Sequence, residues 1–220
     1  VVSIATLNTA TQPYNVAVNA SGSNITNAVT FSNTGTVTLG TSGGTLAFTG
    51  GLTATAPSGI TVAGTMTAAG TGVLNLGAPV TVSANATIGG TSTGNITLGA
   101  ATLADGVTLT VGTGIANAIS LSSVTGTASG TSSNLTINTT GAVTVSGAIG
   151  TDIGTITITN SGGTTFSSTV SASTVTLTNT TGTITFNGAV TATTLNTAAQ
   201  AYNVALNAAS GTITNAVTFS

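Results

Sequence analysis

Residues 6–32 read TLNTATQPYNVAVNASGSNITNAVTFS, and residues 194–220 read TLNTAAQAYNVALNAASGTITNAVTFS. The two copies align without a gap at an offset of about 188 residues, and their differences are mild, as where Val18 is replaced by Leu206. A compact enzyme does not restart its own sequence at its end, whereas fibres and tandem arrays do. We therefore expect residues 1–220 to be one continuous segment of a larger repetitive protein with this long period.

The composition excludes several classes of function. The chain has no Lys, Arg, His, Cys, Trp or Glu, and its only acids are Asp105 and Asp152. Nucleic-acid binding and adhesion to acidic lipid both depend on cationic side chains, so neither is expected. A chain without cysteine has neither a disulfide framework nor thiolate chemistry. No run of about 18 apolar residues occurs, so no membrane-spanning helix is predicted.

Short alternating segments that end at Gly, Asn or Ser make up the local pattern. VTLTV at residues 107–111 ends at Gly112, and TITF at residues 183–186 ends at Asn187. Such alternation places apolar side chains on one face of a strand and Thr on the other. Hydrophobic residues make up 40% of the chain, with many β-branched ones, which favours strands around a continuous core. The sequence therefore predicts an all-β protein.

A shorter repeat lies within the long one. Large apolar residues, each followed by small ones and then by alternation, recur most often at about 20 to 28 residues. The interval from Leu121 to Phe166 is about twice as long, which predicts two rungs there. This spacing favours an elongated parallel β-solenoid (β-helix) of roughly 20–24-residue rungs, stacked about 4.8 Å apart, over a propeller. The predicted core anchors are Phe31, Phe48, Leu76, Leu98, Leu121, Phe166, Phe186 and Phe219.

Corner residues complete this prediction. Gly and Asn tolerate positive φ and suit tight corners, and stacked Asn side chains are suited to amide ladders. Tyr14 and Tyr202 occupy equivalent positions in the two copies, where they either fill a corner of the core or mark a lateral contact. Charged and proline guards of exposed strand edges are scarce, so we expect the unit to continue covalently or to pair with neighbours.

Runs such as TVSASTVTLTNTTGTITFNGAVTATTLNT, residues 169–197, resemble the β-strand repeats of very large bacterial secreted proteins. These include filamentous-haemagglutinin-like exoproteins and the passenger regions of autotransporters. The resemblance covers the whole chain and rests on pattern and composition. It implies a right-handed β-helical shaft, export across the outer membrane to the cell surface, and a role in adhesion, biofilm or surface fibres.

No catalytic, cofactor-binding or metal site is predicted. Some β-helical enzymes cleave polysaccharides with paired carboxylates, but Asp105 and Asp152 have no Glu, His, Lys or Arg to assist them. We interpret both as turn aspartates that precede a strand. Two isolated acids also fall short of the six to eight oxygen ligands that Ca²⁺ takes.

The expected function is therefore structural and non-enzymatic, as the shaft of an extracellular surface fibre, adhesin or matrix filament. Its expected partners are further copies of itself, joined end to end, covalently or laterally, together with glycans or other cell-surface components. The alternative is a solenoid that binds ice or glycan through an aligned Thr face, and a carbohydrate-active enzyme is a third candidate. Ice binding requires a straight two-column Thr array, but the Thr pairs do not recur at one fixed spacing in the sequence. An enzyme requires Asp105 and Asp152 to face one groove, and a fibre requires neither.

Overall fold

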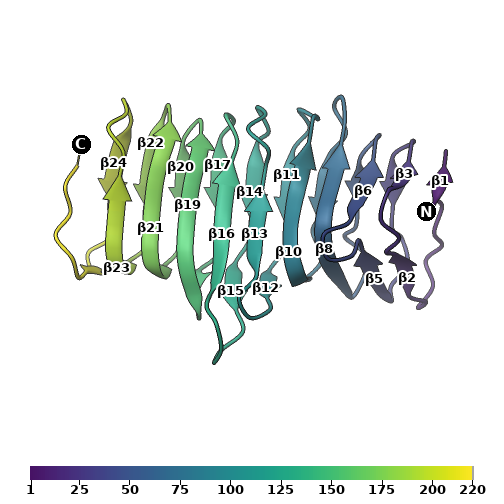
Figure 1. Ribbon diagram of the computed structural model, residues 1–220, viewed down its shortest axis with the longest axis horizontal. Helices are drawn as coiled ribbons and strands as arrows, with labels where there is room; N and C mark the ends of the chain where they lie inside the picture. Colours follow the sequence, from purple (N-terminus) through teal and green to yellow (C-terminus); the bar gives the residue numbers. More distant parts are fainter. Residues whose placement is uncertain (220) are drawn as a thin grey trace.

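The computed structural model describes residues 1–219, and Ser220, the last residue of the second copy, lies outside them. The chain forms an all-β parallel solenoid of about 10 turns, with successive coils about 21 residues apart (Figure 1). The predicted fold class and rung length are therefore confirmed. Within the described residues, no helix has the length and apolar character that crossing a bilayer requires.

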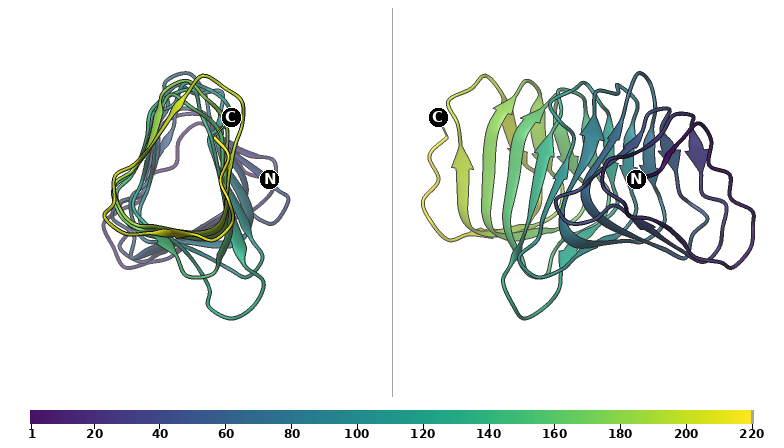
Figure 2. Two further views of the ribbon diagram at one scale, coloured as in Figure 1. Left: turned by 90° about the vertical axis from the view of Figure 1, so that its left-hand side faces the viewer. Right: turned by 45° about the vertical axis from the view of Figure 1, so that its right-hand side comes forward.

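The solenoid has a triangular cross-section, so that each coil contributes to three faces (Figure 2). The first face contains β2 (Val16–Val18), β5 (Thr36–Leu39), β12 (Ala101–Leu103), β15 (Val124–Gly126), β18 (Ile149–Gly150) and β25 (Thr212–Ile213). The second face contains β1 (Ser3–Ile4), β3 (Ser23–Ile25), β6 (Thr45–Phe48), β13 (Thr108–Val111), β16 (Ser133–Asn138) and β19 (Ile153–Ser161). Four long strands continue from the first face onto the second: β8 (Gly59–Ala68), β10 (Val80–Gly90), β21 (Val170–Thr180) and β23 (Val190–Thr197).

The third face is a separate nine-stranded parallel sheet. Its strands are β4 (Val29–Thr30), β7 (Leu52–Thr53), β9 (Leu74–Leu76), β11 (Ile96–Leu98), β14 (Ile119–Leu121), β17 (Val143–Val145), β20 (Thr164–Phe166), β22 (Thr183–Phe186) and β24 (Asn203–Leu206). One coil cannot bury its own apolar face, and stacking in register supplies both the backbone partners and the core.

The core consists of columns in which one inward position repeats from coil to coil. On the third face one column passes through Leu76, Leu98, Leu121, Val145, Phe166 and Phe186. Val145 occupies the position between Leu121 and Phe166, so the long interval in the sequence does hold two coils. The aromatic rings of Phe166 and Phe186 stack with their centroids 4.8 Å apart, the spacing of adjacent strands.

The predicted anchors divide into two groups. Seven of them, including Phe31 and Phe48, are at most 2% exposed, and these two rings pack edge to face with centroids 6.3 Å apart. Phe219 departs from the prediction because it is 59% exposed. It is the counterpart of Phe31 in the second copy, but within residues 1–219 no further coil lies over it as the coil of Phe48 lies over Phe31.

Buried polar side chains line the corner between the second and third faces. The residues at this position in five successive coils are Ser92, Asn117, Thr139, Ser161 and Thr180. Thr139 donates its hydroxyl to the carbonyls of Ile115 (2.8 Å) and Asn117 (2.6 Å), and it accepts the N–H of Gly141 (2.9 Å). The side chain thus satisfies backbone groups that turn away from the strand ladder, as buried polar groups require.

A second polar ladder lies nearby and is solvent-accessible. The Asn160 side chain donates to the amide oxygen of Asn138 (3.2 Å), and Asn179 donates to that of Asn160 (2.6 Å). The Asn ladder expected from the sequence is therefore present at this corner. Because each amide both donates and accepts, the ladder links three successive coils.

The two copies of the long repeat form the same local contacts. Ala10 N–H donates to the Tyr14 hydroxyl at 2.7 Å, and Ala198 N–H donates to the Tyr202 hydroxyl at 3.1 Å. The side-chain hydrogen bond from Asn27 to the Thr6 hydroxyl likewise recurs 188 residues later. The copies nevertheless lie on different faces, because β2 is on the first face and its counterpart β24 is on the third. The long period is therefore not a whole number of turns.

Replacing the ring at the centre of the aromatic stack tests the core. Phe166→Ala removes a buried ring between Val145 and Phe186, so we expect it to lower the free energy of unfolding by about 3–5 kcal/mol. Chemical denaturation followed by circular dichroism measures this change. The control is Thr165→Ala on the outward side of the same strand, where a loss below about 0.5 kcal/mol is expected. Equal losses in the two variants would contradict this description of the core.

The buried corner is tested by an isosteric substitution. Thr139→Val keeps the shape of the side chain but leaves two carbonyls and the Gly141 N–H without their partner. We expect a loss of about 1–3 kcal/mol in unfolding free energy, the cost of buried polar groups without partners. The exposed neighbour provides the control, since Thr140→Val should change the same measurement little. A Thr139→Val protein as stable as the parent would show that these hydrogen bonds do not hold the corner.

Candidate functional site

The second face carries a two-column array of outward side chains. In five successive coils, strands β13, β16, β19, β21 and β23 each present two outward residues separated by one inward residue. We call this array the threonine lattice, and it consists of Thr108, Thr110, Asn134, Thr136, Thr155, Thr157, Thr174, Thr176, Thr194 and Asn196. Eight of these ten positions are Thr.

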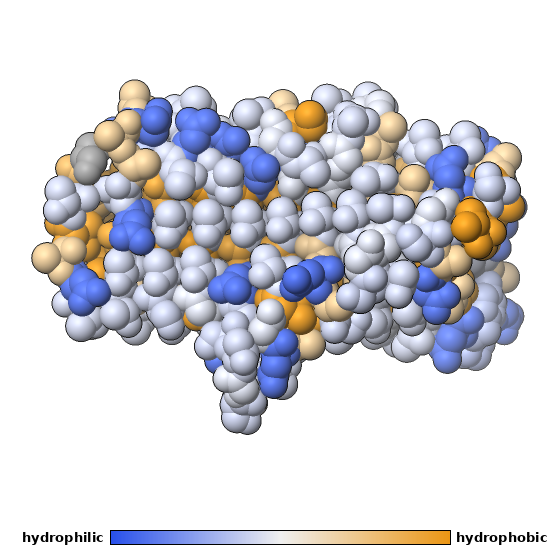
Figure 3. Space-filling view, viewed as in Figure 1, coloured by the Kyte–Doolittle hydropathy of each residue, from blue (hydrophilic) through white to orange (hydrophobic). Residues whose placement is uncertain are grey.

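The register across the lattice is uninterrupted. Thr110 pairs with Thr136, Thr136 with Thr157, and Thr157 with Thr176, and the register shifts of β16 fall outside its lattice residues. Strand geometry places neighbouring lattice residues about 4.8 Å apart between coils and about 6.7 Å apart along a strand. Regular rows of weakly hydrophilic side chains cross this side of the molecule in Figure 3. The array therefore repeats in two dimensions.

The lattice hydroxyls are largely free of the protein. Within residues 1–219, the hydroxyls of Thr136, Thr157 and Thr176 form no hydrogen bond with protein groups, and their side chains are half-buried among neighbours of the same kind. The Thr178 hydroxyl, one position beyond the lattice, instead donates to backbone carbonyls at 2.8 Å. Lattice hydroxyls are thus available to order water, while their methyl groups fill the space between them.

The other two faces each have a central column of this kind rather than a pair. On the third face this column runs through Thr97, Ser120, Thr144, Thr165 and Thr185. The first face has a comparable column through Thr38, Thr61, Thr81, Thr102 and Thr125. The second face differs because its strands are long enough to expose two outward positions in each coil.

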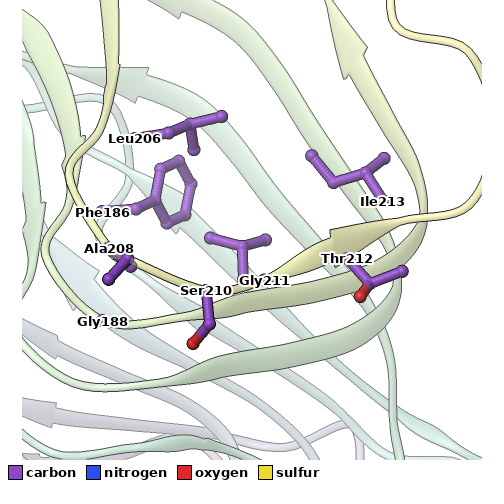
Figure 4. Close-up of a pocket in the computed structure, with 10 residues that line it drawn as sticks. Phe186, Gly188, Leu206, Ala208, Ser210, Gly211, Thr212 and Ile213 are labelled. Carbon is purple, nitrogen blue, oxygen red and sulfur yellow. The ribbon is translucent and has the colours of Figure 1, made fainter.

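The C-terminal end of the stack exposes part of the core. A hollow of about 290 Å³ opens there, lined by Phe186, Val190, Leu206 and Ile213 (Figure 4). Leu206 is 47% exposed, although it pairs directly with the fully buried Phe186 of the preceding coil. Within the described residues β24 and β25 each pair with a strand on one side only, so their outer backbone edges are unpaired.

The two aspartates lie beside the loop of residues 127–132, which projects from the shaft between β15 and β16 (Figure 1). Asp105 contacts Gly130, and Asp152 accepts the Ser132 hydroxyl at 2.7 Å. β16 lies between the strands that follow the two acids, so they are two coils apart, about 10 Å. Each contact ties the loop to a neighbouring coil, which is a structural role.

Asp152 also has an unusual backbone. Its φ is 56°, and Thr151 before it has a φ of 50°, so both residues adopt the left-handed region. Asp tolerates this conformation better than most residues because its short side chain hydrogen-bonds locally. The structure places Asp152 at the turn that leads into β19, in agreement with its interpretation as a turn residue.

Tyr14 and Tyr202 lie at corners, each closing a short loop onto its own backbone. The Tyr202 hydroxyl, which accepts Ala198 N–H, also donates to the carbonyl of Leu177 in the preceding coil at 3.3 Å. Tyr14 is 39% exposed, whereas Tyr202 packs against the core. Of the two alternatives that the sequence left open, these contacts favour the corner role.

Among residues 1–219 no three His, Cys, Asp or Glu side chains gather into a group able to hold a metal ion. The fold and these surfaces define the class of protein, a parallel β-solenoid with an uncharged lateral surface and an open terminal coil. Comparison with known proteins finds no matching protein family, no matching characterised protein and no matching solved structure.

Proposed function

We propose that this chain is a non-enzymatic structural protein, the shaft of a fibre, adhesin or matrix filament at the bacterial cell surface. The observation that carries the proposal is the open C-terminal coil, where Leu206 and the hollow beside it continue the core column to the surface. An unpaired parallel edge above an uncovered apolar column is a template for another coil. The occupant that we propose is a second copy of the chain, docked end to end.

The opposite end has complementary character. Val1, Val2 and Ile4 are 86%, 37% and 38% exposed, and β1 pairs with β3 on one side only among the described residues. Docking the N-terminal coil of one copy on the C-terminal coil of another would pair both backbone edges and cover both apolar surfaces. The driving force is the burial of apolar area, at about 25 cal/mol per Å².

Charge does not oppose this association. The formal net charge is −2 over 220 residues, and both acids lie beside the projecting loop rather than at the ends. Copies therefore approach one another with little electrostatic repulsion, and the assembly should be insensitive to salt. In an adhesin, such a shaft would extend a separate binding region towards glycans or other cell-surface components.

Assembly of the purified chain tests the proposal. We expect filaments with a layer spacing of about 4.8 Å along their axis, observed by electron cryomicroscopy. Leu206→Asp places a charge in the docking surface without altering the buried core, so it should prevent filament formation and leave short rods. The control is Val73→Asp, which adds the same charge at a side chain that is 40% exposed in a lateral loop.

The pair of variants separates docking from a general effect of charge. Sedimentation velocity should show Leu206→Asp as monomers under conditions where the parent and Val73→Asp proteins assemble. Parent protein that remains as single short rods at high concentration would overturn the proposal. Assembly of Leu206→Asp at the rate of the parent would equally exclude the terminal coil as the docking surface.

A further inference from the structure

The two-column array on the second face extends further than its five ranks. Its central column begins at Thr45 and continues through Thr65 and Thr87 before it reaches Thr110. Seven consecutive coils thus present Thr at one outward position, up to Thr176, followed by Asn196. A random choice of outward β-former would not hold one residue type through so many coils, because Val, Ile, Tyr and Ser suit the position as well.

The chemistry of this surface selects its ligand. Within residues 1–219 the second face presents no charged side chain in the lattice, and its ten residues include no aromatic ring for stacking on a sugar. What it offers is a repeated pair of groups, a hydroxyl that hydrogen-bonds water and a methyl that water surrounds with an ordered cage. Each group alone binds water weakly, so that recognition depends on many groups acting together.

The spacing decides which form of water fits. Lattice residues repeat at about 4.8 Å across coils and at about 6.7 Å along strands. These values are close to the two repeats between oxygen atoms on the prism plane of hexagonal ice. A rigid, flat array with both repeats can hold a layer of water in positions that an ice crystal continues, whereas liquid water has no such order to match.

We propose that the threonine lattice is an ice-binding surface. Hydroxyls of Thr136, Thr157 and Thr176 anchor waters in register, and the methyl groups between them order the waters that bridge the two columns. The rigidity comes from the solenoid, since the inward residues Leu135, Ile156 and Val175 that separate the two columns are fully buried. The lattice requires neither filament assembly nor the terminal coil, so this proposal is independent of the shaft function.

Freezing behaviour tests the proposal directly. The purified chain should separate the freezing temperature of ice from its melting temperature, shape single ice crystals, and inhibit recrystallisation, each increasingly with protein concentration. Thr157→Tyr places a ring in the middle rank, which lifts the surface away from the ice, and it should lose most of all three effects. Thr144→Tyr makes the same change at an exposed position on the third face and should keep them.

Two further measurements separate a loss of ice binding from a loss of folding. Circular dichroism and thermal unfolding should be the same for the parent, Thr157→Tyr and Thr144→Tyr proteins. If Thr157→Tyr fails to fold, Thr157→Val replaces it, because Val keeps the shape and the methyl but lacks the hydroxyl, and it should weaken the activity. A folded parent protein that affects neither freezing nor recrystallisation would overturn the proposal, as would equal loss of activity in the Thr157→Tyr and Thr144→Tyr variants.

Discussion

Parallel backbone pairing between successive coils is the constraint on which the rest of this structure depends. Each strand pairs with the strand about 21 residues before it and the one about 21 residues after it, so every inward or outward position becomes a column. Because side chains alternate with a period of two, a slip of one residue would exchange the inner and outer faces of a coil. The Phe166–Phe186 stack and the threonine rows therefore have the same cause.

The corners are where this pairing is hardest to maintain, and the chain places its buried polar residues there. Thr139 binds two carbonyls of the preceding coil and one N–H of its own turn. Two residues later, the backbone of Gly141 lies so close to the Asn117 carbonyl that a Cβ would overlap it. A hydroxyl residue and a glycine at this separation satisfy the turn and allow coils to approach to the strand spacing.

The sequence predicts the fold well because alternation and large apolar anchors report directly on inward columns. It hides the lattice because coil length varies: Ile158 pairs with Leu177, 19 residues on, whereas Val111 pairs with Ile137, 26 residues on, across the projecting loop. A fixed period cannot align such coils, so the Thr pairs look irregular until the backbone register orders them. The buried corner did leave a signal, a Ser or Thr two residues before Gly, as at Ser161 and Thr180.

The long repeat and the coil are not commensurate, and this affects what a filament presents. β2 lies on the first face while its counterpart β24 lies on the third, so one repeat turns the pattern by one face. A stack continued with the same period would carry successive lattices on successive faces rather than along one side. Each lattice would then act alone, with a flat extent set by the coils of one unit. Length in such a stack would add rigidity and reach, while the area of each flat face would stay the same.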